Sequence, residues 1–221
     1  MSQSELRENV GHNFRVNVID GAFFGLGALG LASSVTVLPL FLNAMGASAF
    51  VIGLVGSLHA IGWQLPQLFT SGYVARLRRY KPMVLFMSFH ERWPFFGLAL
   101  MALLWPTVGA NVVIPLTLLL LLIYGLGGGL AGTAWQSMIG KIIPTKQRGT
   151  FFGMQSAAAS LLGAGGAVAA GIILERLPSP TDFIICFTLA GIALMVSMGF
   201  LALTREPKHD LPEDSETRKL G

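Results

Sequence analysis

The sequence predicts an all-α integral membrane protein. Of its 221 residues, 53% are hydrophobic and only 12% are charged, whereas roughly a quarter of the residues of soluble proteins are charged. The mean hydropathy is +0.65. Backbone amides cannot stay unpaired in lipid, so apolar runs of about 20 residues or more are expected to cross a bilayer as helices. Four such runs contain no Asp, Glu, Lys or Arg: residues 21–75, 93–140, 149–174 and 183–204.

The first three predicted helices end at proline, glycine, asparagine or charged residues, which interrupt the apolar pattern. Residues 18–42 form the first helix, which ends before the joint "NAMGASA". Residues 50–74 form the second, which ends at the basic joint "RLRRYKP". Residues 82–105 form the third, which ends at "PTVGAN".

The last three predicted helices have boundaries of the same kind. They cover residues 112–138, 150–174 and 183–204. The joint "KIIPTKQRG" follows the fourth helix, "ERLPSPTD" follows the fifth, and the polar segment "REPKHD" follows the sixth. Residues 18–204 are therefore predicted to form one domain with six transmembrane helices.

The basic residues predict how this domain is oriented. Thirteen of the fifteen Lys and Arg lie on one side, in residues 1–17, in the second and fourth joints, and in residues 205–221. The opposite side holds only Arg176. The positive-inside rule therefore predicts a multi-pass protein of the plasma (inner) membrane, with residues 1–17 as a cytoplasmic amino-terminal segment and residues 205–221 as a polar cytoplasmic tail. Because the basic residues lie in short clusters between apolar runs, no nucleic-acid partner is expected.

The stretch "MSFHERWPFF" places Glu91 and Arg92 inside the third predicted helix. If these charges ended a helix, only about 13 apolar residues would remain, too few to span a bilayer. Glu91 lies about 14 Å along the helix from Pro82, near the bilayer midplane. A charge at that depth costs at least about 2.5 kcal/mol, so both side chains are expected to face the bundle interior. A transport pathway and a structural ion pair explain them equally well, and Pro94 favours transport because a proline kinks a helix.

Other polar residues are candidates for the same pathway. His90 adjoins the pair, and His59 reaches a similar depth, where it can share a proton or a hydrogen bond with Glu91. The other candidates to line an interior path are Gln64, Gln67, Gln136 and Gln155, although an interhelical hydrogen bond explains each of them alone. Asp20 is interpreted as an interfacial residue at the end of the first helix.

No motif for an enzyme, a metal or a cofactor is found. Cys186 is the single cysteine, so a CxxC site cannot form. The segment "HERWP" starts like a zinc motif, but Pro94 occupies the position of the second histidine. The sequence "GLGALG" at residues 25–30 matches a dinucleotide pattern, yet no strand precedes it and no acidic residue follows about twenty positions later.

The glycines are instead predicted to pack helices closely. Gly25 belongs to "GLGALGLASS" in the first helix, and Gly129 belongs to the similar string "GLGGGLAGTA" in the fourth. This similarity indicates a three-plus-three inverted repeat, a construction found in transporters. In the fifth helix, Gly163 and Gly171 belong to a stripe of small residues at intervals of four.

The second joint, "GYVARLRRYK", resembles the signature G-x-x-x-D-[RK]-x-G-[RK]-[RK] of the major facilitator superfamily. Gly72 and Lys81 match that signature, whereas Arg76 replaces its aspartate, Arg79 replaces its second glycine, and Arg78 lies between them. The segment "IPTKQRGTFFG" after the fourth helix is also similar to this family. The chain thus resembles the amino-terminal six-helix half of such a transporter, and residues 205–221 resemble the start of its central linker. Since the aspartate helps to latch the family's cytoplasmic gate, that latch is not expected here in its usual form.

This resemblance implies a function and a partner. We expect secondary-active transport of a small solute, with protons as the first candidate for coupling because Glu91 and His59 lie at similar depth. Family members hold their substrate between two six-helix halves, so the chain is expected to be a fragment of a longer transporter, or to pair with itself or with a separately encoded second half. The alternative is a membrane scaffold or regulatory protein that does not transport, in which the buried charges are structural.

Overall fold

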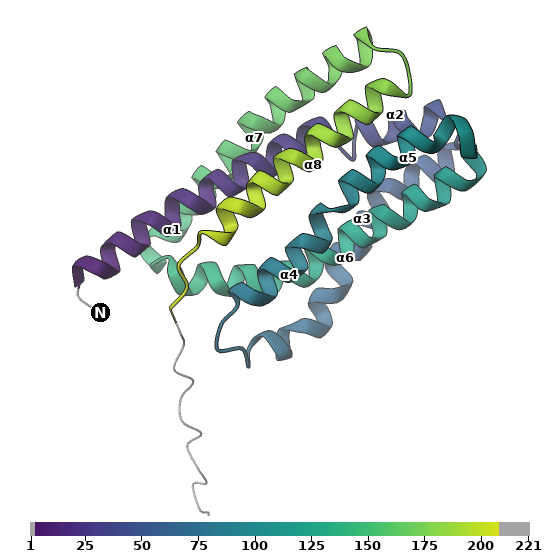
Figure 1. Ribbon diagram of the computed structural model, residues 1–221. Coiled ribbons are helices and arrows are strands. Elements are labelled where there is room, and N and C mark those ends of the chain that lie inside the picture. Colours follow the sequence, from purple (N-terminus) through teal and green to yellow (C-terminus); the bar gives the residue numbers. More distant parts are fainter. Residues whose placement is uncertain (1–2, 208–221) are drawn as a thin grey trace, which may run out of the picture.

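The computed structural model describes residues 3–207, and every regular element in that range is helical. Figure 1 shows the long helices running side by side in an elongated bundle. The all-α prediction is therefore confirmed for the described residues. The elements are α1 (Gln3–Phe24), the π-helix η1 (Gly25–Leu31), α2 (Val37–Ala44), α3 (Ala49–Val74), α4 (Lys81–Arg92), α5 (Pro94–Val108), α6 (Ala110–Ile142), α7 (Thr145–Arg176) and α8 (Thr181–Ala202).

Five helical segments in the described residues are long and apolar enough to cross a membrane: Asn9–Leu31, α3, α6, α7 and α8. The predicted third helix, residues 82–105, is helical but is divided into α4 and α5 at Trp93. Pro94 follows directly and has no amide hydrogen to donate, so the ladder of hydrogen bonds is interrupted there. The break comes immediately after the buried pair Glu91 and Arg92.

The prediction of one first helix over residues 18–42 was wrong in two respects: the helix starts earlier, and it is interrupted before residue 42. Helix α1 begins at Gln3, η1 extends it to Leu31, and α2 begins after a break at residues 32–36. The polar residues of its first turns lower the local hydropathy, which hid this part of the helix. Asn13 and Asn17 are buried and bond the segment that follows α8, because Asn13 Nδ2 donates to the Arg205 carbonyl at 2.9 Å and Asn17 Nδ2 donates to Thr204 Oγ1 at 3.0 Å.

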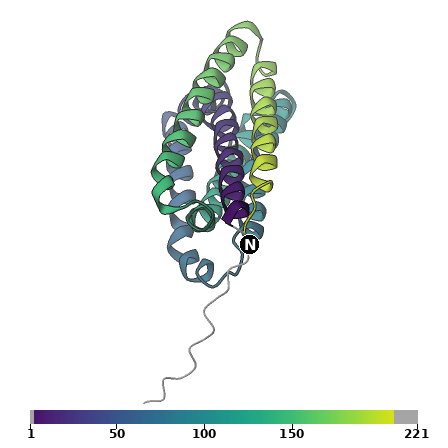
Figure 2. The same cartoon turned by 90° about the vertical axis from the view of Figure 1, so that its left-hand side faces the viewer.

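Helix α8 connects two groups of helices. On one side, α1 and η1 pack against α7 and α8. Figure 2 shows α1 between α7 and α8. On the other side, α6 packs against α3, α4 and α5, and α8 packs against α5. The largest buried side chains, among them Phe41, Phe95 and Phe187, fill the space between the two groups.

Glycines allow two of the helix crossings to be very close. A Cβ atom on Gly30 of η1 would lie 2.6 Å from the Gly163 carbonyl oxygen of α7. A Cβ atom on Gly129 of α6 would lie 2.5 Å from the Gly62 carbonyl oxygen of α3. Both distances are too short for any side chain.

Of the four glycines predicted to pack helices, three lie at these crossings: Gly25, Gly129 and Gly163. Gly171 does not, because an added Cβ there meets no described atom within 4 Å. The small-residue stripe of α7 therefore packs only over part of its length. Periodicity alone could not indicate where the contact with η1 ends.

Candidate transport site

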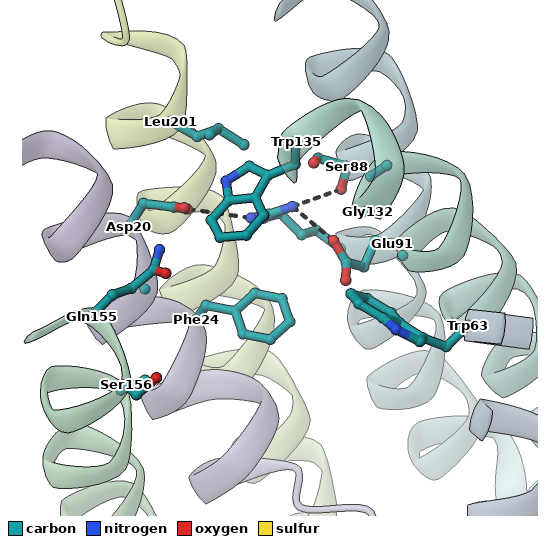
Figure 3. A pocket seen from close by; sticks show the side chains of 15 residues that line it. Asp20, Phe24, Trp63, Ser88, Glu91, Gly132, Trp135, Gln155, Ser156 and Leu201 are labelled. Atoms are coloured by element: carbon teal, nitrogen blue, oxygen red, sulfur yellow. Dashed lines mark hydrogen bonds and ion pairs between the residues drawn. The ribbon is translucent and has the colours of Figure 1, made fainter. Parts of the chain in front are cut away.

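A network of buried polar side chains surrounds Arg92, at the end of α4. Arg92 Nη1 lies 3.1 Å from Glu91 Oε2 and donates to the Ser88 carbonyl at 3.2 Å. Arg92 Nη2 lies 3.3 Å from Asp20 Oδ1 of α1 and donates to Ser197 Oγ of α8 at 3.2 Å. Ser197 in turn donates to Asp20 Oδ1 at 2.6 Å. One guanidinium therefore joins α1, α4 and α8. Figure 3 draws its contacts with Asp20, Ser88 and Glu91 as dashed lines.

The charged groups of this network are almost completely removed from solvent. Asp20 and Glu91 are each 5% exposed, and Arg92 is 3% exposed. Removing charges from water is costly, and mutual attraction repays that cost only when geometry and additional hydrogen bonds are good. The serine contacts provide such hydrogen bonds to Arg92 and Asp20. The network therefore depends on all of its members being present.

A cavity of about 220 Å³ lies beside this network. Its wall includes the aromatic side chains Phe24, Trp63 and Trp135, which come from α1, α3 and α6 (Figure 3). The Phe24 ring lies against the guanidinium of Arg92, with Cζ 5.4 Å from the ring centroid. Gln155 and Ser156 of α7 and Ser88 of α4 add polar groups to the wall.

Glycines of α6 make this arrangement possible. A Cβ atom on Gly127 would lie 2.5 Å from the Glu91 amide nitrogen, so α4 approaches the α6 backbone directly. A Cβ atom on Gly128 would lie 2.7 Å from Glu91 Oε1 and 2.8 Å from the Trp63 ring. The string "GLGGG" therefore gives room both to the carboxylate and to the indole.

The family model described as Major Facilitator Superfamily matches residues 90–220, more than half of the sequence. The chain belongs to the Major Facilitator Superfamily. Its members are membrane transporters, and with its membrane-length apolar helices this chain is an integral, multi-pass membrane protein. Comparison with curated proteins and with solved structures gave no match.

The matched part of this Major Facilitator protein contains Glu91 and Arg92. Asp20 and Trp63 lie outside it, as does the altered signature at residues 72–81. The resemblance that the sequence showed at that signature is thus independent of the match. The site combines residues from both parts of the chain.

Three of the predicted pathway residues line the cavity within the described part of the chain: Glu91, Arg92 and Gln155. His90 lies outside its wall, and its Nδ1 is 2.8 Å from the Phe86 carbonyl oxygen. The ring of His59 stacks on Tyr124 with centroids 4.7 Å apart, and no hydrogen bond joins it to Glu91 within residues 3–207. The remaining predicted residues, Gln64, Gln67 and Gln136, do not line the cavity, and the side chains of Gln64 and Gln136 are exposed.

Sequence reasoning assigned Asp20 to the interface, and that assignment was wrong. The membrane-length segment is Asn9–Leu31, so Asp20 lies in its middle and not at its end. The error came from the helix boundary, because a start at residue 18 places Asp20 in the first turn. Trp63, Trp135 and Ser197 were also missed, because their types give no signal of an interior position on a membrane helix.

The altered signature lies at the basic end of the bundle, which we define by residues 75–81, 140–148 and 203–207. Arg76, Arg78 and Arg79 are exposed there, and Lys81 begins α4. Gly72 is exposed in the last turn of α3, just before this end. None of the predicted gate residues supplies a carboxylate.

A carboxylate reaches this joint from the segment that follows α8. Glu206 accepts hydrogen bonds from the Tyr80 amide at 3.0 Å and the Lys81 amide at 2.8 Å, and its Oε1 lies 3.0 Å from Lys141 Nζ of α6. These are amides that α4 itself leaves unpaired at its N-terminus. Lys81 Nζ donates to the Thr204 carbonyl at 2.8 Å. The start of α4, the end of α6 and the end of α8 are thus held together by one acidic residue.

Proposed function

We propose that this chain is one six-helix half of a secondary-active transporter, and that the cavity beside Arg92 is part of its solute path. The observation that supports this proposal best is the buried network of Asp20, Glu91 and Arg92 on the wall of a 220 Å³ cavity. Ionisable residues inside a membrane bundle typically mark the path of a substrate or an ion. Membership of a transporter family favours the same interpretation.

The helix count of this proposal includes α4 and α5 as one broken span. Together they cover residues 81–108, which is long enough to cross a bilayer even with a kink at Trp93. With the five continuous spans this gives six. Broken helices near a binding site are a common feature of transporters.

The pairing of helices supports the three-plus-three inverted repeat. In such a repeat the first span corresponds to the fourth, the second to the fifth and the third to the sixth. The first span packs against the fifth through η1 and α7, and the fourth packs against the second through α6 and α3. Both crossings bring glycines together, Gly30 with Gly163 in one and Gly62 with Gly125 in the other. Likewise α1 contacts α8 and α6 contacts α4.

A second six-helix unit is the proposed partner, either another copy of this chain or a separately encoded half. Helices α3 and α7 have only 17% of their apolar windows buried, against 44% to 50% for the other membrane-length segments. Both helices lie next to the cavity, since Trp63 of α3 and Gln155 of α7 line it. A partner that covers these two helices would close the cavity. The basic end is proposed to face the cytoplasm.

The test is a transport assay with a site variant. Cells that express the full chain are incubated with a mixture of small solutes, and the contents of the cells are measured by mass spectrometry. The expected result is a change in the level of at least one solute, which Glu91→Gln abolishes and Glu175→Gln, at an exposed carboxylate of α7, leaves intact. If Glu91→Gln keeps full transport at an equal membrane level, the proposed role of the cavity is wrong. The scaffold alternative would be favoured if the unaltered chain transports no solute and Glu91→Gln unfolds more easily in detergent.

A further inference from the structure

We propose that the cavity binds a small organic cation, an ammonium group with an apolar body. This inference rests on the proposed function, because it names the class of solute that the same cavity takes. Three features of the cavity lead to it: the balance of charge in its wall, the free oxygens of its carboxylates, and its aromatic side chains.

The wall of the cavity has more negative than positive groups. Asp20, Glu91 and Arg92 are the charged residues that line it within the described part of the chain. With all three ionised, the site has one uncompensated negative charge. Such a charge is costly in a low-dielectric site unless a positive group lies close to it. A cationic solute supplies that group.

The carboxylates keep oxygens available for such a solute. Arg92 contacts Oε2 of Glu91 and Oδ1 of Asp20. Glu91 Oε1 and Asp20 Oδ2 have no hydrogen-bond partner among residues 3–207. Figure 3 shows the second oxygen of Glu91 directed toward Trp63, and both of these groups lie close to Gly128. A carboxylate oxygen and an indole ring therefore lie close together at one place in the cavity.

The aromatic side chains suit a cation with an apolar body. Cations are attracted to aromatic faces, most strongly to tryptophan, within about 6 Å of the ring centroid. Phe24 already contacts the guanidinium of Arg92 in this way. Trp63 and Trp135 line the cavity from α3 and α6, so their rings remain available to a solute. The volume of 220 Å³ is below the roughly 300 Å³ typical of the smallest drug-sized pockets, which indicates a small solute.

An anion fits this wall poorly. Both terminal nitrogens of Arg92 already contact carboxylates, and Nε is the buried donor of that side chain that has no partner in residues 3–207. An anionic solute could therefore gain at most this one donor from Arg92, and it would meet two carboxylates. The experiment therefore has to distinguish cationic from anionic solutes of similar size.

Two probes of similar size and opposite charge provide the test. Purified full-length protein in detergent is titrated by calorimetry with phenyltrimethylammonium and, separately, with benzenesulfonate. Phenyltrimethylammonium has a permanent charge and cannot release a proton, so its binding reports an organic cation and not proton uptake. We expect it to bind, and we expect benzenesulfonate not to bind. Asp20→Asn and Glu91→Gln should each weaken binding of the cation by about tenfold or more, because each removes a negative charge that attracts it electrostatically.

Glu175→Gln is the matched control, since it removes an exposed carboxylate far along α7 and should leave the binding unchanged. Absence of phenyltrimethylammonium binding, or binding in both site variants that is as tight as in the unaltered protein, would overturn the inference. If a variant fails to fold, the comparison of the two probes on the unaltered protein still decides. Binding of benzenesulfonate alone would overturn the charge assignment and leave the proposed transport function standing, because that function requires only that a solute enters the cavity.

Discussion

Arg92 Nη2 lies 3.3 Å from Asp20 Oδ1, and this contact joins α4 to α1 across 72 positions of the sequence. Both side chains are buried, and Arg92 contacts Glu91 at the same time. Neither carboxylate has another cationic partner in the described residues. The stability of the bundle centre therefore depends on one guanidinium.

Replacing that guanidinium should destabilise the protein strongly. Arg92→Met keeps an apolar stem but leaves two buried carboxylates without a cation, and loss of one partner of a buried pair typically costs about 3 to 5 kcal/mol. Thermal unfolding in detergent should therefore shift to a clearly lower temperature. Arg92→Met combined with Asp20→Asn and Glu91→Gln should recover part of the loss, because no unpaired charge remains. An unchanged unfolding temperature in Arg92→Met would contradict the buried network.

The glycine crossings predict a second stability effect. A Cβ on Gly62 would lie 2.8 Å from the Gly125 backbone, so Gly62→Val should push α3 and α6 apart and cost about 1 to 3 kcal/mol. Gly171→Val places the same side chain on α7 in open space and is the matched control. Unfolding temperatures of the two variants provide the measurement. Equal stability of both would mean that α3 and α6 are not in close contact.

Glu206 should stabilise the basic end of the bundle. Glu206→Gln keeps a hydrogen-bonding group near the amides of Tyr80 and Lys81 but removes the ion pair with Lys141. Substituted helix caps typically cost about 0.5 to 2 kcal/mol, and a loss in this range is expected. Limited proteolysis at the joint of residues 75–81 should become faster. Protection equal to that of the unaltered protein would show that this contact does not hold the joint.

The orientation of the bundle can be tested by cysteine labelling. Cys186 is buried, so it should react little in the folded protein. Arg78 and Arg176 are both exposed, at the basic end and at the end of α7 respectively, so Arg78→Cys and Arg176→Cys form a matched pair. In intact cells a membrane-impermeant maleimide should label Arg176→Cys, and should label Arg78→Cys only after permeabilisation. The reverse pattern would place the basic end outside.

Several features could be predicted from the sequence because they depend only on the order and spacing of residues along the chain. Charge-free runs and their lengths predicted helical spans, whereas the length argument that placed Glu91 and Arg92 inside one unbroken helix missed the division after Arg92. Asp20 was misplaced because polar residues begin α1, so the apolar run does not mark its start. Asn13 and Asn17 offset their polarity through contacts with residues 204–205, which are distant in sequence.

The direction in which a side chain points was harder to predict than its depth. Successive residues on a helix project about 100° apart. Trp63 therefore lines the cavity while the neighbouring Gln64 is exposed on another face of α3. His59 is at a depth that suits Glu91, but its ring stacks on Tyr124 of α6. Which face of a helix points toward the cavity depends on contacts between helices, and these contacts cannot be read directly from the sequence.

The π-helix η1 sets the direction in which the second part of the first span projects its side chains relative to the first part. A π-turn accommodates more residues than an α-turn, so the side chains before and after residues 25–31 are rotated relative to an uninterrupted α-helix. Asp20 and Phe24 precede this segment and face the cavity, whereas Gly30 lies within it and faces α7. Deletion of a single residue here would change that rotation by roughly 100°. The first span could then keep its glycine contact with α7 or its carboxylate contact with Arg92, but not both.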